Sequence, residues 1–247
     1  MRWRVIPFDY HNAAKNMAID EAIMESVKAG GKPTIRFYGW FPSAVSIGYF
    51  QSMDQVVNLK KCEELGVGIV RRRTGGGSVY HSNSGEITYS LIAPEEMFPK
   101  NIIESYREIC GYVIKGLKNL GIESEFKPIN DIGIGHKKIS GNAQTRRNGI
   151  LLQHGTILYD VHVGKMFAVL NVPSEKIKDK LIKSVQERVT RILDFECVGK
   201  EQVYEALLKG FVEHKEFDFG DLTNEEEKRI EELIESKYKS KKWNFMK

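Results

Sequence analysis

Cysteine is scarce in this sequence, and the cysteines that occur are far apart. Cys62, Cys110 and Cys197 form no CxxC pair. An odd number of widely spaced cysteines predicts free thiols in a reducing compartment and offers no framework for a structural zinc site. No apolar run approaches the roughly 18 residues of a membrane span, and the segment 1–7 is too short and polar for a signal peptide. We therefore expect a cytoplasmic protein with no membrane partner.

Several common catalytic motifs are missing as well. The sequence has no GxxxxGK[ST] phosphate loop, no GxGxxG after its first expected strand, no GxSxG elbow and no HExxH helix. Its six histidines are not spaced like metal ligands. If this protein binds a nucleotide, it does so through a less common binding motif.

The composition is that of a globular protein. The chain has 247 residues, of which 41% are hydrophobic and 28% charged, so it can bury one large core. We expect a single domain over residues 1–247, in which about 195–247 form a helical C-terminal extension. The formal net charge of +4 favours an anionic substrate or acidic partners and does not by itself indicate nucleic acid.

The most distinctive stretch is a triple glycine that follows a run of arginines. Arg71–Arg73 and Thr74 precede Gly75–Gly77 at the end of an apolar segment. Glycine has no Cβ, so it permits positive φ and lets amide N–H groups approach a ligand. Guanidinium groups suit phosphate or carboxylate. The stretch therefore predicts either an anion-binding loop or a glycine-rich hairpin turn with a solvated basic edge.

Hydrophobic periodicity and turn residues predict alternating helices and strands. The expected helices cover residues 12–29, 54–65 and 103–121, followed by charged helices beyond 163 and a last helix that starts at a capping box of Thr223 and Glu226. The expected strands cover residues 3–8, 34–40, 44–50, 67–72, 85–92, 122–126, 137–144 and 150–158. We expect 34–40 and 44–50 to form a hairpin, and 85–92 to pair with the segment through Val79.

A second group of polar residues lies around the strand expected at 137–144. A lysine such as Lys138 before a small Ser-Gly pair can place its ammonium in a pocket, but lysines at strand starts are more often solvated. Asn130 and Asp131 are of the residue types that commonly start turns. His154 lies in an apolar strand, where a hydrogen-bonded core histidine is commoner than a catalyst.

Four motifs, in this order, resemble the lipoate-protein ligase family. They are Arg-Arg-x-Thr-Gly-Gly-Gly-x-Val-x-His at 71–81, Asn-Asp at 130–131, Lys-Lys-Ile-Ser-Gly-Asn-Ala-Gln at 137–144 and Gln-His-Gly-Thr-Ile-Leu at 153–158. The resemblance implies an α/β (α+β) fold of the biotin-ligase and lipoate-ligase type, with a mixed, largely antiparallel sheet flanked by helices.

The same resemblance implies an ATP-dependent ligase. Such an enzyme converts lipoate and ATP, with Mg²⁺, to lipoyl-AMP and then acylates a lysine of a lipoyl domain. The implied partners are the acyltransferase subunits of 2-oxoacid dehydrogenases and the H protein of glycine cleavage.

The resemblance also assigns roles to residues. Lys138 is similar to the catalytic lysine that reaches the lipoyl carbonyl and the α-phosphate, and Arg72 to a phosphate-contacting arginine. Asp131 is a candidate for holding Mg²⁺. The remaining residues implied in binding the nucleotide and the acyl-adenylate are Gly75, Gly76, Gly77, Ser78, Val79, Tyr80, Asn130, Gly141 and His154. Fixed cations and backbone donors would stabilise the charge that builds on the α-phosphorus.

Two departures from the family pattern change the expectation. The family has an acidic residue directly after the histidine of its first motif, whereas Ser82–Gly85 follow His81. The chain also ends at Lys247, where single-chain ligases continue into an accessory domain. We therefore expect a separate accessory subunit to be needed for adenylation.

Two other functions remain as alternatives. Octanoyltransferases of the same superfamily take their acyl group from acyl carrier protein through a cysteine thioester, and residues 141–155 resemble some of them strongly. No cysteine lies near the pocket motifs, and that absence favours the ligase. A non-catalytic module would use Arg71–Arg73 and Arg146–Arg147 to bind nucleic acid or an effector, although such modules usually have a denser basic face.

Overall fold

The computed structural model describes residues 1–160, 163–172 and 175–246. Its strands are β1 (Trp3–His11), β2 (Thr34–Trp40), β3 (Ala44–Ile47), β4 (Gly68–Arg71), β5 (Val79–His81), β6 (Glu86–Pro94), β7 (Glu125–Lys127), β8 (Asp131–Ile134), β9 (Lys137–Arg147), β10 (Ile150–Leu158) and β11 (Phe217–Phe219). Its helices are α1 (Ala13–Lys28), α2 (Met53–Val56), α3 (Leu59–Glu64), α4 (Ile102–Lys118), α5 (Val163–Val169), α6 (Glu175–Arg188), α7 (Lys200–Val212), α8 (Asn224–Leu233) and α9 (Lys241–Asn244).

The strands form two sheets. The larger has eight strands in the order β11-β1-β2-β6-β10-β9-β8-β7, and the smaller has three in the order β4-β3-β5. In the large sheet β1 is parallel to β2 and β11, whereas the other neighbouring strands are antiparallel. The expected α/β fold, with a mixed and largely antiparallel sheet flanked by helices, is confirmed.

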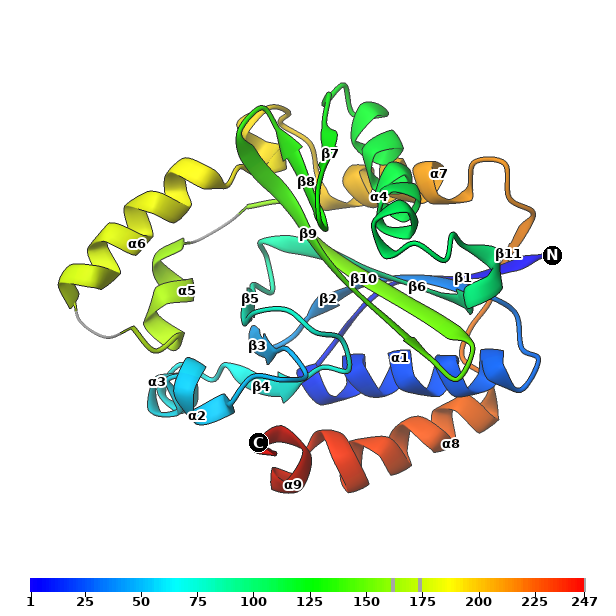
Figure 1. Ribbon diagram of the computed structural model, residues 1–247, viewed down its shortest axis with the longest axis horizontal. Helices are drawn as coiled ribbons and strands as arrows, with labels where there is room; N and C mark the ends of the chain where they lie inside the picture. The colour runs from blue at the N-terminus through cyan, green and yellow to red at the C-terminus, as the bar shows by residue number, and fades with distance from the viewer. Residues whose placement is uncertain (161–162, 173–174, 247) are drawn as a thin grey trace.

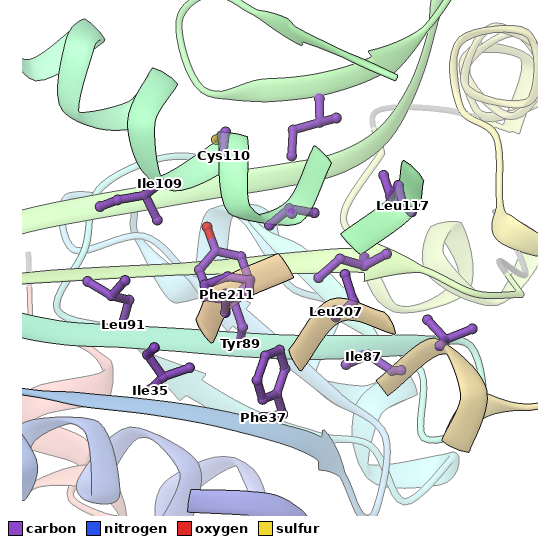
Figure 2. Close-up of a cluster of buried hydrophobic side chains, with 14 of the residues drawn as sticks. Ile35, Phe37, Ile87, Tyr89, Leu91, Ile109, Cys110, Leu117, Leu207 and Phe211 are labelled. Carbon is purple, nitrogen blue, oxygen red and sulfur yellow. The ribbon is translucent and has the colours of Figure 1, made fainter. Parts of the chain in front are cut away.

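Helices cover both faces of the large sheet. α4 and α7 lie on one face and α1 on the other, with α8 packed against α1 (Figure 1). Figure 2 shows the core beneath α4 and α7, where Tyr89 of β6 meets Cys110 of α4 and Phe211 of α7. Full burial of an apolar side chain such as that of Phe211 contributes about 1.5–3 kcal/mol to the stability of the fold. Cys110 is buried, as its place in the apolar stripe predicts.

Side-chain caps fix where two helices begin. The Asn12 carboxamide accepts a hydrogen bond from the Lys15 N–H at 2.9 Å and starts α1. Thr223 and Glu226 form the predicted capping box at the start of α8, with bonds of 3.2 and 3.0 Å. Glu226 also binds Arg4 of β1 at 2.7 Å, which ties the C-terminal helices to the first strand.

Two predicted strand pairings were wrong. Residues 34–40 and 44–50 form no hairpin, because β2 lies between β1 and β6 in the large sheet while β3 lies between β4 and β5 in the small one. β5 pairs with β3 and not with β6. Both edges of β6 are taken by β2 and β10, so distant strands decide these pairings.

The helix expected over 54–65 is divided into α2 and α3. Val57 bridges Leu170, and the Asn58 side chain accepts a hydrogen bond from the Lys61 N–H at 3.1 Å to start α3. Strand β11 was not predicted, because a strand of three residues has too little periodicity to be detected. Among the residues that the structure describes, every helix is too short or too polar to cross a bilayer.

Candidate active site

A cavity of about 330 Å³ opens between residues of both sheets. This volume is at the lower end of the range for small-molecule sites, about 300–1,000 Å³. Strands β2, β3, β5, β6, β9 and β10 contribute to its walls, and so do α5 and α6. Its apolar lining includes Leu158, Met166, Val185 and Val189. The cavity therefore combines an apolar wall with the polar motifs described next.

Residues from all four motifs meet at this cavity. The predicted site residues that line it are Arg72, Gly76, Gly77, Ser78, Val79, Tyr80, Asn130, Lys138, Gly141 and His154. Gly75 and Asp131 do not line it. Asp131 instead holds Lys138, with 2.7 Å between its Oδ1 and the Lys138 Nζ. Lys138 on β9 and the glycine loop between β4 and β5 thus face the same space.

Arg72 organises the glycine loop. Its Nη2 donates to the carbonyl oxygens of Gly75 and Gly77 at 2.7 and 2.8 Å. Its Nε donates to Thr74 Oγ1 at 3.1 Å, and its Nη1 donates to the Ser46 carbonyl and hydroxyl oxygens at 3.3 and 3.2 Å. Burial lowers the pKa of Arg72 to about 10, so the group remains cationic at neutral pH. Every guanidinium nitrogen has a protein acceptor, so the phosphate contact implied for Arg72 has no free donor here.

The shape of the glycine loop requires glycine at one position within it, Gly76, and at Gly48, which directly follows β3. Gly76 has a φ of +96°, which L side chains rarely adopt. A Cβ at Gly48 would lie 2.0 Å from the Gly76 carbonyl oxygen. At Gly75, in contrast, an added Cβ meets nothing within 4 Å. The approach of Gly48 to Gly76 therefore sets the shape of the loop.

Replacing Gly48 with alanine is expected to displace the loop and to lower the free energy of unfolding by about 1–3 kcal/mol. Gly75→Ala is the matched control, and its free energy of unfolding should stay within about 0.5 kcal/mol of the wild type. Urea unfolding of the three proteins measures both values. Equal stability of Gly48→Ala and the wild type would show that the loop does not depend on this approach.

His154 supports the loop from β10. Its Nε2 lies 2.8 Å from Thr74 Oγ1, and its Nδ1 lies 3.4 Å from Asp20 Oδ2. Burial lowers the pKa of His154, which favours the neutral imidazole. Asp20 is itself bound to Arg36 at 2.9 Å. A chain of buried polar groups therefore connects the first turn of the loop to α1.

His81 has an acidic partner that the motif does not predict. The carboxylate of Glu86, on β6, lies 2.6 Å from His81 Nδ1, although no acidic residue directly follows the histidine in the sequence. Ser46 Oγ lies 2.8 Å from His81 Nε2. Sequence reasoning missed Ser46 and Glu86. The one available signal was an acidic residue five positions after His81, across a turn.

None of the cysteines lines the cavity. Cys62 and Cys110 are buried, and burial raises the pKa of their thiols to about 11 and about 12. Cys197 is exposed. Because the thiolate is the reactive form, the two buried thiols are poor nucleophiles at neutral pH.

We expect iodoacetamide at pH 8 to modify Cys197 alone in the folded protein. The buried thiols should react only after denaturation, because they are protonated and shielded from solvent. Peptide mass spectrometry before and after addition of guanidinium chloride measures this. Fast labelling of Cys110 in the folded protein would show that its thiol is accessible, contrary to the structure.

Comparison with known proteins identifies octanoyltransferases and a lipoate-protein ligase as relatives. The chain is 35% identical to octanoyltransferase LipM of Brevibacillus brevis over 275 aligned positions, which cover 99% of both chains. It is 36% identical to octanoyltransferase LipM of Kyrpidia tusciae over 274 positions, again 99% of both chains. The solved structure of a bi-partite lipoate protein ligase from Thermoplasma acidophilum, described with its E2 lipoyl domain, matches with a TM-score of 0.90 and 35% identity, covering 99% of this chain and 96% of that one.

These relatives overturn the expected ATP-dependent lipoate-protein ligase. The curated relatives at 35% and 36% identity are named octanoyltransferases, and a transferase moves an acyl group that is already activated. The expectations of ATP, Mg²⁺, lipoate and lipoyl-AMP, and of a nucleotide-binding ligase, are therefore wrong. The error was to take the missing pocket cysteine as evidence against transfer. It argues only against an intermediate bound to cysteine.

The expectation that Asp131 holds Mg²⁺ is wrong together with the expectation of ATP and Mg²⁺ as cofactors. Its carboxylate is paired with the Lys138 ammonium at 2.7 Å. In the described part of the chain, no group of three or more histidine, cysteine, aspartate or glutamate residues is placed to hold a metal ion.

The family itself is established over most of the sequence. A family model described as the lipoyl protein ligase A/B catalytic domain matches residues 12–212. The fold agrees with the lipoate-protein ligase of Thermoplasma acidophilum. The chain belongs to the lipoyl protein ligase A/B catalytic domain family.

Proposed function

We propose that this chain transfers an octanoyl group from the thioester of an acyl carrier protein to a lysine of a lipoyl domain. The observation that carries the proposal is its identity of 35% and 36% to octanoyltransferases over 99% of its length. The acceptor follows from the Thermoplasma acidophilum relative, which was described with its E2 lipoyl domain. Because the proposed donor is already activated, the reaction requires no accessory subunit for adenylation.

The cavity supplies what this reaction needs. Its apolar lining, with Leu158, Met166 and Val185, suits a medium-length acyl chain. Attack on the thioester places negative charge on the carbonyl oxygen, and the Lys138 ammonium and the N–H groups of the glycine loop are donors that can stabilise it. The site residues thus keep a role in acyl transfer in place of nucleotide binding. The free cysteines fit the cytoplasm, where we place the reaction.

The experiment is mass spectrometry of an apo lipoyl domain incubated with the purified chain and octanoyl acyl carrier protein. EDTA is present, and ATP is left out. We expect the lipoyl domain to gain the mass of one octanoyl group. A lipoyl domain whose acceptor lysine is replaced with arginine is the matched control and should gain nothing. An unmodified wild-type acceptor after many equivalents of donor would contradict the proposal.

A further inference from the structure

Three polar side chains of the cavity form a hydrogen-bonded series that nothing in the motifs predicts. Ser46 Oγ lies 2.8 Å from His81 Nε2, and His81 Nδ1 lies 2.6 Å from Glu86 Oε1. All three residues line the cavity. A nucleophile bonded to a base that a third group orients is the arrangement of serine acyl-transfer enzymes, which is identified by geometry and not by chain order. Resting on the proposed octanoyl transfer, we propose that Ser46 is the nucleophile that carries the acyl group.

The neighbours of His81 hold it in the form that a base requires. Glu86 Oε1 also accepts a hydrogen bond from Thr88 Oγ1 at 3.0 Å, and Thr88 Oγ1 accepts one from Trp40 Nε1 at 2.9 Å. The Trp40 ring stacks on the His81 ring with 3.9 Å between centroids. The Glu86 carboxylate accepts a hydrogen bond from the Nδ1–H of His81, which leaves the Nε2 lone pair directed at the Ser46 hydroxyl.

Arg72 adds a fixed positive charge beside the nucleophile. Its Nη1 donates to Ser46 Oγ at 3.2 Å, so the Ser46 proton is left to point toward His81. Negative charge that develops on Oγ during proton transfer is stabilised by this guanidinium. Ser46 is only 1% exposed, so a substrate reaches it through the cavity.

A second hydrogen-bonded series, Thr74–His154–Asp20, differs from the first in its access to the cavity and in the partners of its acid. Thr74 Oγ1 lies 2.8 Å from His154 Nε2, but Thr74 does not line the cavity. The acid of that series, Asp20, lies 3.4 Å from His154 and binds Arg36 at 2.9 Å. In the described residues no Lys or Arg forms an ion pair with Glu86, whose partners are His81 and Thr88. The His154 series therefore anchors the loop, whereas the His81 series faces the substrate.

The reaction needs no further component. Ser46 Oγ attacks the thioester carbonyl carbon while its proton moves to His81 Nε2. The C–S bond breaks, and the carrier thiol leaves with that proton, which leaves an octanoyl ester on Ser46. The neutral amine of the acceptor lysine then attacks this ester. Its proton passes through His81 to Ser46 Oγ as the C–O bond breaks, so the amide forms and the free serine is restored.

The test combines trapping with substitution. The wild type is incubated with octanoyl acyl carrier protein, or with p-nitrophenyl octanoate, in the absence of acceptor. We expect one octanoyl group on the peptide that contains Ser46, and we expect it to survive neutral hydroxylamine, which cleaves thioesters. Ser46→Ala should form no such adduct and should transfer at least about 100-fold more slowly. Ser105→Ala removes another buried serine hydroxyl, outside the cavity, and should match the wild type.

The Ser46→Cys variant separates a chemical role from a structural one. A thiol at this position should accept the acyl group as an adduct that hydroxylamine removes, which a serine needed only for packing would not do. The proposal is overturned by an adduct on Cys62, Cys110 or Cys197, or by transfer at the wild-type rate in Ser46→Ala, and either result leaves the proposed octanoyl transfer standing. A wild type that forms no adduct with either donor overturns it too. If that protein also fails to modify the lipoyl domain, the proposed function falls as well.

Discussion

Replacing Lys138 with alanine is expected to slow octanoyl transfer about 100-fold, because removing one donor to a developing oxyanion typically costs 10²–10³ in rate. Lys138 Nζ lies at the cavity, held by Asp131 at 2.7 Å. The backbone around it is fixed as well, because its carbonyl oxygen accepts a hydrogen bond from the Thr190 N–H at 2.9 Å. The ammonium is therefore positioned before the substrate arrives.

This loss should appear in kcat and not in stability. The Lys138 side chain is 42% exposed, and an ion pair at that exposure contributes only about 0–1 kcal/mol to folding. Lys137→Ala is the matched control, because successive residues of a strand point to opposite faces and Lys137 does not line the cavity. Steady-state kinetics and urea unfolding of both variants measure the two effects. An unchanged kcat in Lys138→Ala would remove Lys138 from the reaction.

Replacing Arg71 with alanine is expected to lower the free energy of unfolding by about 3–5 kcal/mol. The side chain is 1% exposed, and its donors serve carbonyl oxygens from two parts of the chain. Those before the glycine loop belong to Gly48, Tyr49 and Gln51, at 3.3, 2.7 and 2.6 Å. Those of the C-terminal segment belong to Trp243, Asn244 and Met246, at 2.9, 2.9 and 2.8 Å. Alanine would remove the guanidinium donors from all six carbonyl oxygens at once.

Two further substitutions make this result specific. Arg71→Lys should fall between alanine and the wild type, because an ammonium cannot reproduce the planar set of guanidinium donors. Arg107→Ala removes a largely exposed arginine of α4 and should change the free energy of unfolding by no more than about 0.5 kcal/mol. Urea unfolding followed by tryptophan fluorescence reports on the whole set, since Trp243 lies in the anchored segment. A loss below about 1 kcal/mol in Arg71→Ala would show that other contacts hold the C-terminal segment.

The arginine run illustrates what the sequence could and could not predict. Residues of its motif line the cavity, and the run of glycines was the local signal that drew attention to this loop. The three guanidinium groups suggested an anion-binding site, but each of them binds other groups of the protein instead. Arg71 holds the C-terminal segment, Arg72 holds the glycine loop and Arg73 binds Glu21. Those partners are far away in sequence or belong to the backbone, so residue types alone do not reveal them.

The residues of the proposed nucleophilic series were unpredictable for a related reason. Ser46 and Glu86 lie on strands of different sheets, and the turn at Trp40–Ala44 that separates those sheets was predicted as a hairpin. With β3 assigned to the wrong sheet, nothing placed Ser46 beside His81. The apolar wall from α5 and α6 was equally hidden, since a charged helix with a short apolar stripe is typical of a solvated surface.

The source of the acyl group is the central claim, and one mixture tests it. The purified chain and an apo lipoyl domain are incubated with deuterated octanoyl acyl carrier protein together with unlabelled octanoate, ATP and Mg²⁺. Mass spectrometry of the lipoyl domain then reports which donor was used. We predict the deuterated group, at the same rate when ATP is omitted. An unlabelled group that appears only with ATP would contradict the account.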